Sequence, residues 1–163
     1  MLQRPKGCCF TGHRFPPPGG WEALRQSMDD MLEHAVSKGV TCFYSGGAMG
    51  FDMFAAERVL AYRTAHPEAG VRLVLMVPCA DQAFRWPLSQ RRQYERILSQ
   101  ADEAVCLSVG YSEGVMRQRN TLLVERADVC VAYCTRAVGG AAQTVRMAMD
   151  ADLPIWHLVD PAP

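Results

Sequence analysis

The sequence has no hydrophobic run long enough to span a membrane, and its first residues lack the apolar stretch of a secretory signal. Its 163 residues are enough for one domain with a sizeable core, and a hydrophobic content of 49% argues against disorder. No repeat, linker or low-complexity segment divides residues 1–163. We therefore expect a single domain of a cytoplasmic protein without membrane contact.

An excess of charge is also missing, because 17 basic residues balance 17 acidic ones. Extended nucleic-acid surfaces usually carry a basic excess, so nucleic acid is not the expected partner. Lysine is scarce: Lys6 and Lys38 are the only two, and the other 15 basic residues are arginine. Arginine suits phosphate and carboxylate ligands, although a genomic codon bias gives the same composition.

The chain has seven cysteines but no C-x-x-C pair. Disulfide frameworks are typical of shorter secreted chains. Cys130 and Cys134 would lie about 13 Å apart along a strand, too far to share one zinc ion. Since most of the cysteines lie in or beside apolar runs, we expect small buried side chains and no metal site.

Strand-like and helix-like segments alternate along the chain. Apolar runs predict strands at 7–12, 41–46, 71–78, 103–110, 128–134 and 154–159. Helical spacing of apolar residues predicts helices at 21–39, 51–66, 90–101, 114–127 and 141–152. Strands that are apolar on both faces and alternate with helices form a covered parallel sheet. The sequence thus predicts an α/β fold, a Rossmann-like three-layer sandwich with a mainly parallel sheet of about six strands and helices on both faces.

Polar and glycine-rich segments follow the first five predicted strands. They read TGHR, SGGAMG, PCADQ, GYSEG and TRAVGG in chain order. In a parallel sheet these loops all emerge at the carboxyl edge, which is where open α/β folds bind their ligands. We therefore place the candidate site at that edge.

Gly46, Gly47 and Gly50 precede the second predicted helix. A bare backbone at a helix N-terminus suits a phosphate group, but it also suits a tight turn without a ligand. No lysine follows, so the loop is not a Walker motif. Ser45 occupies the first glycine place of G-x-G-x-x-G, and the loop follows the second strand, not the first, which disfavours a nicotinamide dehydrogenase.

A second glycine pair, Gly139 and Gly140, also precedes a predicted helix. Two such loops can hold two ends of one anionic ligand. Four arginines are expected in or near the same edge, and as a group they favour anion binding over solvated surface charge. They are Arg14, Arg117, Arg119 and Arg136.

Four stretches now stand in a recognisable order: FTGHR, YSGGAMGFDMFAAE, MRQRNTLLVERADVCVAY and the GG before the last helix. They resemble the YpsA-like branch of the bacterial SLOG superfamily, which also includes the DNA-uptake protein DprA/Smf and the LOG phosphoribohydrolases. The resemblance covers nearly the whole chain. It implies a Rossmann-like fold that binds a nucleotide-type ligand, such as ADP-ribose, an NAD-like molecule or a nucleoside phosphate. It also implies a homodimer, and no other cofactor is expected.

The resemblance assigns the ligand or phosphate site to residues that match the family motifs. These residues are Thr11, Gly12, His13, Arg14, Ser45, Gly46, Gly47, Ala48, Gly50, Asp52, Arg119, Asn120, Gly139 and Gly140. His13 either contacts the ligand or fixes its loop by a hydrogen bond. Trp86 and Tyr111 either stack on a base or pack at the rim of the cleft.

Two departures from the family bear on catalysis. Ala141 stands where a threonine is common, so the hydroxyl is missing or displaced to Thr144. LOG enzymes carry a glutamate shortly after this glycine loop, and AAQTVRM offers none. Cleavage of an N-glycosidic bond needs a carboxylate near the sugar. The sequence therefore favours a binding or sensor protein, and the alternative is a nucleotide N-glycosidase with Asp52 and Arg119 as candidate catalytic residues. Asp52 could accept a ribose hydroxyl or simply complement the helix dipole.

Two further hypotheses find less support. GYSEG fits the G-x-S-x-G pattern of a serine hydrolase, with Ser112 as nucleophile. However, His157, the only histidine downstream, lies in a predicted strand, and Ser112 is expected to cap the following helix. DprA-like binding of single-stranded DNA is weakened by the zero net charge.

Overall fold

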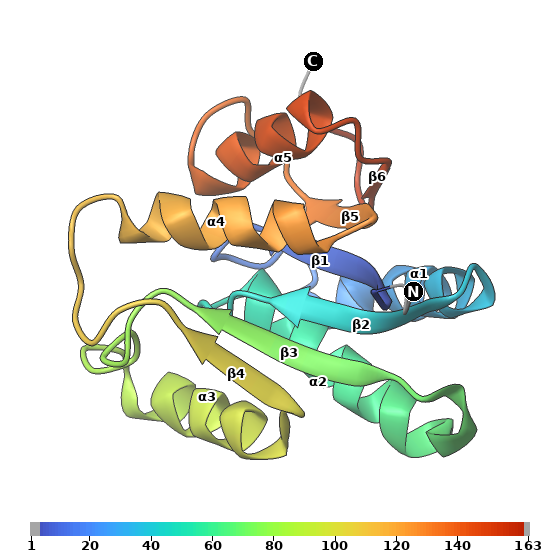
Figure 1. The fold of residues 1–163 in the computed structure, drawn as a ribbon, viewed down its shortest axis with the longest axis horizontal. Helices are drawn as coiled ribbons and strands as arrows, with labels where there is room; N and C mark the ends of the chain where they lie inside the picture. The colour runs from blue at the N-terminus through green and yellow to red at the C-terminus, as the bar shows by residue number, and fades with distance from the viewer. Residues whose placement is uncertain (1–3, 162–163) are drawn as a thin grey trace.

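The computed structural model describes residues 4–161. Six parallel strands form one sheet in the order β4-β3-β2-β1-β5-β6 (Figure 1). The strands are β1 (Lys6–Gly12), β2 (Val40–Ser45), β3 (Arg72–Val77), β4 (Glu103–Cys106), β5 (Val129–Tyr133) and β6 (Ile155–His157). The parallel Rossmann-like sheet predicted from the sequence is therefore confirmed.

Five α-helices and two 3-10 turns connect the strands. The helices are α1 (Arg25–Ser37), α2 (Phe51–Ala65), α3 (Leu88–Gln100), α4 (Val115–Arg126) and α5 (Gly140–Asp150), and the turns are Trp21–Leu24 and Pro67–Ala69. In Figure 1, α1, α2 and α3 cover one face of the sheet, and α4 and α5 cover the other. This is the three-layer arrangement that the alternation of segments predicts.

Three predicted boundaries shift. The helix predicted at 21–39 opens as a 3-10 turn and becomes α-helical only at Arg25. The strand predicted at 103–110 ends at Cys106, opposite Val77, the last residue of β3, and in the loop beyond it Ser108 Oγ donates to the carbonyl of Gly110 (2.8 Å). The prediction that Ser112 caps the next helix is wrong, since the N-cap is Gly114, in a left-handed conformation and without a side-chain bond.

The sheet has a hydrophobic core on each face. On the face covered by α1, α2 and α3, the core contains packed aromatic rings: Phe10 stacks on Phe43 at 6.0 Å and meets Phe51 edge to face at 6.5 Å. On the face covered by α4 and α5, the core includes Cys9 and Cys130, which are partners in the β1–β5 register. Six of the seven cysteines are buried as expected, whereas Cys106 lies exposed on the edge strand β4.

The order of the strands creates a switch point. The chain places β2, β3 and β4 successively outward on one side of β1, and then returns so that β5 pairs with the other side. The loops that follow β1 and β5 therefore diverge at the carboxyl edge. This edge lies toward the left of Figure 1.

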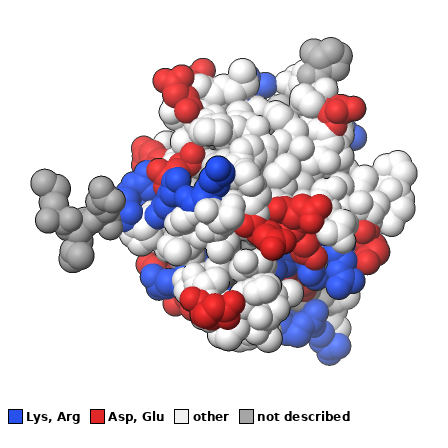
Figure 2. Space-filling model, turned by 90° about the vertical axis from the view of Figure 1, so that its right-hand side faces the viewer, with Lys and Arg blue, Asp and Glu red and all other residues white. Residues whose placement is uncertain are grey.

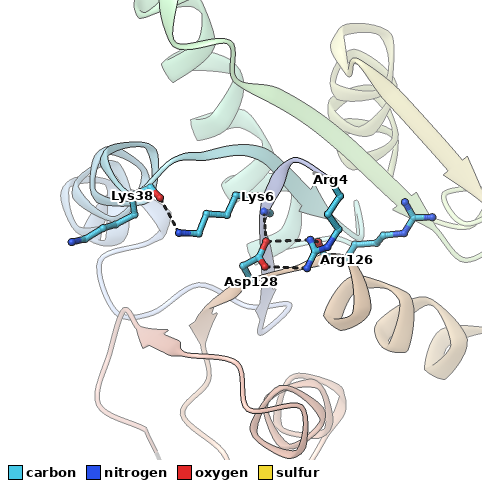
Figure 3. A network of polar contacts seen from close by, with 6 residues as sticks. Arg4, Lys6, Lys38, Arg126 and Asp128 are labelled. Atoms are coloured by element: carbon cyan, nitrogen blue, oxygen red, sulfur yellow. Dashed lines mark hydrogen bonds and ion pairs between the residues drawn. The ribbon is translucent and has the colours of Figure 1, made fainter. Parts of the chain in front are cut away.

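The amino edge of the sheet is closed by polar contacts (Figure 3). Arg4 makes two bonds to the Asp128 carboxylate (3.1 and 3.0 Å), which also accepts the backbone N–H of Gly7 (2.8 Å). Lys6 Nζ donates to the carbonyl of Lys38 (2.9 Å). Figure 2 shows basic and acidic side chains lying next to one another over this face, and not one field of positive charge. These hydrogen bonds at the amino edge join the start of β1 to the residue before β5 and to the end of α1.

Candidate functional site

A cavity of about 610 Å³ opens at the carboxyl edge, within the roughly 300–1,000 Å³ typical of small-molecule sites. The loops after β1, β2, β3 and β4 form it, together with the first turn of α4. The loop after β3 contributes more of the lining than any other. The lining residues are Gly12, Arg14, Ala48, Met49, Pro78, Cys79, Asp81, Gln82, Phe84, Arg85, Trp86, Tyr111 and Met116.

Two lining arginines are available to an anion. Arg14 and Arg85 are exposed, and neither forms an ion pair within residues 4–161. The one side-chain contact of Arg14 in this part of the chain is a long one, from Nη2 to the Met49 sulfur at 3.7 Å. Guanidinium groups without a protein partner are well suited to bind phosphate or carboxylate oxygens.

Aromatic side chains form another part of the lining. Phe84 is 72% exposed and Tyr111 is 71% exposed, although both are large and apolar. Trp86 is half-buried and meets Tyr94 edge to face at 5.4 Å, so its ring is fixed in place. Rings exposed at a cavity wall can stack on the flat base of a ligand.

The glycine loop between β2 and α2 is bonded largely to itself. The N–H of Gly47 donates to Ser45 Oγ (3.2 Å), and the N–H of Ala48 donates to Asp52 Oδ2 (3.3 Å). Ser45 Oγ in turn donates to the carbonyl of Asp52 (2.9 Å). The Asp52 carboxylate thus accepts a backbone N–H that was expected to bind a phosphate. Ala48 nevertheless lines the cavity.

Arg119 supports this loop from behind and is only 4% exposed. Its Nη1 donates to the carbonyl of Gly46 (2.8 Å), and its Nε donates to Asn120 Oδ1 (2.8 Å). A Cβ on Gly46 would overlap the guanidinium group, so this close approach requires glycine. Neither Arg119 nor Asn120 lines the cavity.

Asp52 and Arg119 influence each other inside the protein. Burial raises the pKa of Asp52, and the positive charge of Arg119 together with the Ala48 N–H opposes this rise. Burial likewise lowers the pKa of Arg119, and the charge of Asp52 opposes the fall. Asp52 is 8% exposed and does not line the cavity. The two candidate catalytic residues therefore lie beneath the site, where they hold the loop.

His13 joins the two diverging loops. Its Nε2 accepts the N–H of Thr135 (2.7 Å) and lies 3.0 Å from the Thr135 hydroxyl. Its backbone carbonyl accepts the N–H of Phe51 at the start of α2 (3.0 Å). Burial, and then the nearby charge of Arg136, lower the pKa of His13. The neutral His13 ring accepts this bond and so joins the loop after β1 to the loop after β5. Of the two roles expected for His13, ligand contact or a hydrogen bond that fixes its loop, the structure contains the hydrogen bond.

The second glycine pair is not brought into the cavity. Gly139 and Gly140 follow β5, on the far side of β1 from the cavity loops, and both are exposed. Thr144 Oγ1 donates back to the carbonyl of Gly140 (3.1 Å), so this hydroxyl does not face a ligand. Arg117 lines a separate groove on α4, and Arg136 lines a small pocket beside α5.

Several lining residues were missed from the sequence. Asp81, Phe84 and Arg85 all lie in the loop after β3, of which only the position at the carboxyl edge and Trp86 had been noted. A signal was present, because this loop is long and combines a carboxylate, an arginine and two aromatic residues. Thr11, by contrast, was predicted to bind the ligand but is buried in β1.

The described residues contain neither a cluster of metal-ligating side chains nor a membrane-spanning helix. Across residues 4–161, no three His, Cys, Asp or Glu side chains gather closely enough to hold a metal ion. The helices described in this range are also too short or too polar to cross a bilayer.

Sequence comparison finds relatives among bacterial UPF0398 proteins. The protein from Halalkalibacterium halodurans is 26% identical over 107 residues, which is 64% of this chain and 56% of the relative. The protein from Bacillus velezensis is 24% identical over 107 residues, covering 64% of this chain and 58% of the relative. The chain thus spans little more than half the length of these curated relatives.

Solved structures share the fold. DNA processing protein A from Helicobacter pylori, described with a single-stranded DNA binding mode, aligns over 94% of this chain and 65% of its own, with a TM-score of 0.65 and 20% identity. The molybdenum cofactor carrier protein from Chlamydomonas reinhardtii aligns over 94% of this chain and 76% of its own, with a TM-score of 0.56 and 14% identity. At such identities the likeness concerns the fold alone.

A family model agrees with the motifs and with the fold. The model YpsA, described as the YspA SLOG family, matches residues 19–152. This range runs from the loop before α1 to the end of α5, and so includes most of the cavity lining. The chain belongs to the YpsA SLOG family.

Proposed function

We propose that the protein binds a nucleotide-derived small molecule in the carboxyl-edge cavity. ADP-ribose, NAD-like molecules and nucleoside phosphates are the candidate ligands. The observation that carries the proposal is the presence, in one cavity of about 610 Å³, of two unpaired arginines and two exposed aromatic rings. A nucleotide has the matching pair of features, an anionic phosphate and a flat base.

In this proposal Arg14 and Arg85 bind the phosphate, and Phe84 and Tyr111 stack on the base. Gly12 and Ala48 form the wall at the ends of β1 and β2. The remaining motif residues act indirectly, by holding the loops that carry the lining. They are Thr11, His13, Ser45, Gly46, Gly47, Gly50, Asp52, Arg119 and Asn120.

Isothermal titration calorimetry with AMP, ADP-ribose, NAD and cyclic AMP tests this proposal. We expect at least one of them to bind, and Arg85→Ala to weaken that binding about tenfold or more, because a charge-assisted bond to phosphate is lost. Arg92→Ala, an exposed arginine on α3 outside the cavity, is the matched control. Absence of binding by all four nucleotides, or equal losses in both variants, would overturn the proposal.

A nucleotide N-glycosidase is the second candidate, and the position of Asp81 favours it. The sequence offered no carboxylate after the last glycine loop, but Asp81 brings one into the cavity from another loop. It could stabilise positive charge at C1′ while water adds there and the base leaves with the bond electrons and takes up a proton. Release of free base from nucleoside monophosphates, abolished in Asp81→Asn, would establish this activity.

Binding of single-stranded DNA is the function described for the Helicobacter pylori structure. This chain has zero net charge, and the cavity lining includes the carboxylate of Asp81. We therefore expect no electrophoretic shift of an oligonucleotide at physiological salt. A shift that Arg85→Ala removes would instead favour DNA as the ligand.

A further inference from the structure

We infer that Asp81 recognises the sugar of the ligand, accepting hydrogen bonds from the vicinal hydroxyls of a ribose. The cavity then selects ribonucleotides over 2′-deoxynucleotides. This inference rests on the proposed function, and it names the class of nucleotide that the site takes.

The loop after β3 holds Asp81 at the cavity wall. Its carbonyl accepts the N–H of Phe84 (3.0 Å), and the N–H of the next residue, Gln82, donates to the carbonyl of Cys79 (3.2 Å). Two successive turns therefore fix the backbone on both sides of the carboxylate. Gln82 Nε2 also reaches the carbonyl of Gly47 (3.4 Å), which ties this loop to the glycine loop.

The carboxylate points toward the loop after β4. A Cβ placed on Gly110 would lie 4.0 Å from Asp81 Oδ2, and the next residue, Tyr111, lines the same cavity. Asp81 is thus near one of the rings proposed to stack on the base. In a nucleotide the sugar lies between base and phosphate, so a group that contacts the sugar belongs beside the ring.

The charge of Asp81 limits what it can contact. It is exposed, has no ion-pair partner within residues 4–161, and is the one carboxylate in a lining that holds two arginines. A carboxylate repels phosphate and accepts hydrogen bonds only from donors. A nucleotide offers donors on the ribose, its hydroxyls, and on the base, an exocyclic amine or a ring N–H. Two carboxylate oxygens match two adjacent hydroxyls, as acidic residues of dinucleotide-binding folds do.

Cys79 lines the same cavity as Asp81 and is buried. Burial, and then the neighbouring carboxylate of Asp81, raise the pKa of the Cys79 thiol. The thiol therefore stays protonated at neutral pH and can act as a weak donor to the carboxylate.

Calorimetry with AMP, 2′-deoxy-AMP and purine riboside 5′-monophosphate tests the inference. We expect AMP to bind about tenfold more tightly than 2′-deoxy-AMP, because one hydrogen bond to a charged acceptor is lost. Purine riboside 5′-monophosphate, whose base has neither an exocyclic amine nor a ring N–H, should bind within about twofold of AMP. In Asp81→Asn and Asp81→Ala the preference for ribose should fall to about twofold or less.

Asp150→Asn, an exposed acidic residue at the end of α5, is the control and should retain the full preference. Urea midpoints of all three variants show whether the fold is intact. Equal binding of AMP and 2′-deoxy-AMP by the wild type would overturn the inference and leave the proposed function standing. A loss on removing the amine instead of the hydroxyl would also overturn it. Absence of binding by every nucleotide would overturn the proposed function and the inference together.

Discussion

The carboxyl edge of the sheet consists of two regions that differ in how their polar groups are paired. In the glycine loop after β2, the side chains of Ser45, Asp52 and Arg119 are buried and bonded to one another's backbone or to the loop. In the loops after β1 and β3, Arg14 and Arg85 are exposed and form no ion pair within residues 4–161. The first region is built like a protein interior, and the second like a binding surface.

The difference teaches that a glycine-rich loop is not by itself a ligand site. Gly46 and Gly50 are glycines because other parts of the chain approach them too closely for a side chain. A buried polar group without a partner is costly, so folding satisfies the groups of such a loop internally. Groups that remain exposed and unpaired at a concave wall are the ones free to bind.

The largest expected effect comes from removing the buried cation. Arg119→Met should lower the free energy of unfolding by about 3 kcal/mol, because the Gly46 carbonyl loses its donor and Asp52 loses its compensating charge. Urea denaturation measures the loss. Arg117→Met, an exposed arginine two residues earlier on α4, is the control and should change stability by no more than about 0.5 kcal/mol. Equal losses of stability in the two variants would contradict the structural role assigned to Arg119.

A pair of glycine variants sharpens the same comparison. Gly50 (φ 91°) and Gly139 (φ 107°) each precede a helix in a backbone conformation that favours glycine. A Cβ on Gly50 would overlap the backbone carbonyl of Arg14, whereas a Cβ on Gly139 would meet nothing. Gly139→Ala should therefore cost about 1 kcal/mol from backbone strain alone. Gly50→Ala should cost about 1–3 kcal/mol more, from the added overlap. Thermal or urea unfolding of both variants checks the difference, and a smaller loss at Gly50 would contradict it.

For side chains that line the cavity, we expect a substitution to change nucleotide affinity without changing stability. Tyr111→Ala should weaken nucleotide binding about tenfold, because stacking on a base is lost, and should leave the urea midpoint unchanged. Val109→Ala is a matched control in the same loop, since Val109 is 88% exposed and does not line the cavity. A clear loss of stability in Tyr111→Ala would contradict this, because it would show that the ring supports the fold, as the buried side chains around the glycine loop do.

The smallest effect is a pH dependence that arises at the junction of the two regions. The folded protein lowers the pKa of His13 below its ordinary value near 6.5, so the unfolded chain takes up a proton first as the pH falls. Its contribution to stability is present above pH 6.5 and is lost as the pH falls toward the lower folded pKa. We expect the urea midpoint to drop between pH 7.5 and 5.5, and His13→Asn to reduce that drop. A drop in His13→Asn as large as in the wild type would contradict this assignment.

The fold could be predicted from the sequence because its signals are local. Leu73 to Val77 are buried on both faces of the sheet, and the run RLVLMV shows this directly. The strand order could not be deduced in the same way, since no local pattern states that β5 returns beside β1. The early end of β4 was also missed, because its pairing ends where the neighbouring strand β3 ends, at Val77, and the segment 103–110 does not show this limit.

The site was predicted only in part, for a related reason. Motif matching found Arg14 and the glycine loop, but it did not separate side chains that line the cavity from those that hold the lining in place. Arg119 was assigned to the ligand, and in the structure its guanidinium is bonded to Gly46. Asp81 and Phe84 lie outside the recognised motifs, and only the folding of the β3 loop over the edge reveals them.

The contrast between the two regions is tested most directly by the double variant Arg14→Ala/Arg85→Ala. Its urea midpoint and its affinity for the best-binding nucleotide are measured on the same preparation as the wild type. We predict that the free energy of unfolding stays within about 0.5 kcal/mol of the wild type while the affinity falls about 100-fold. Unchanged affinity, or a loss of stability as large as that of Arg119→Met, would contradict the account.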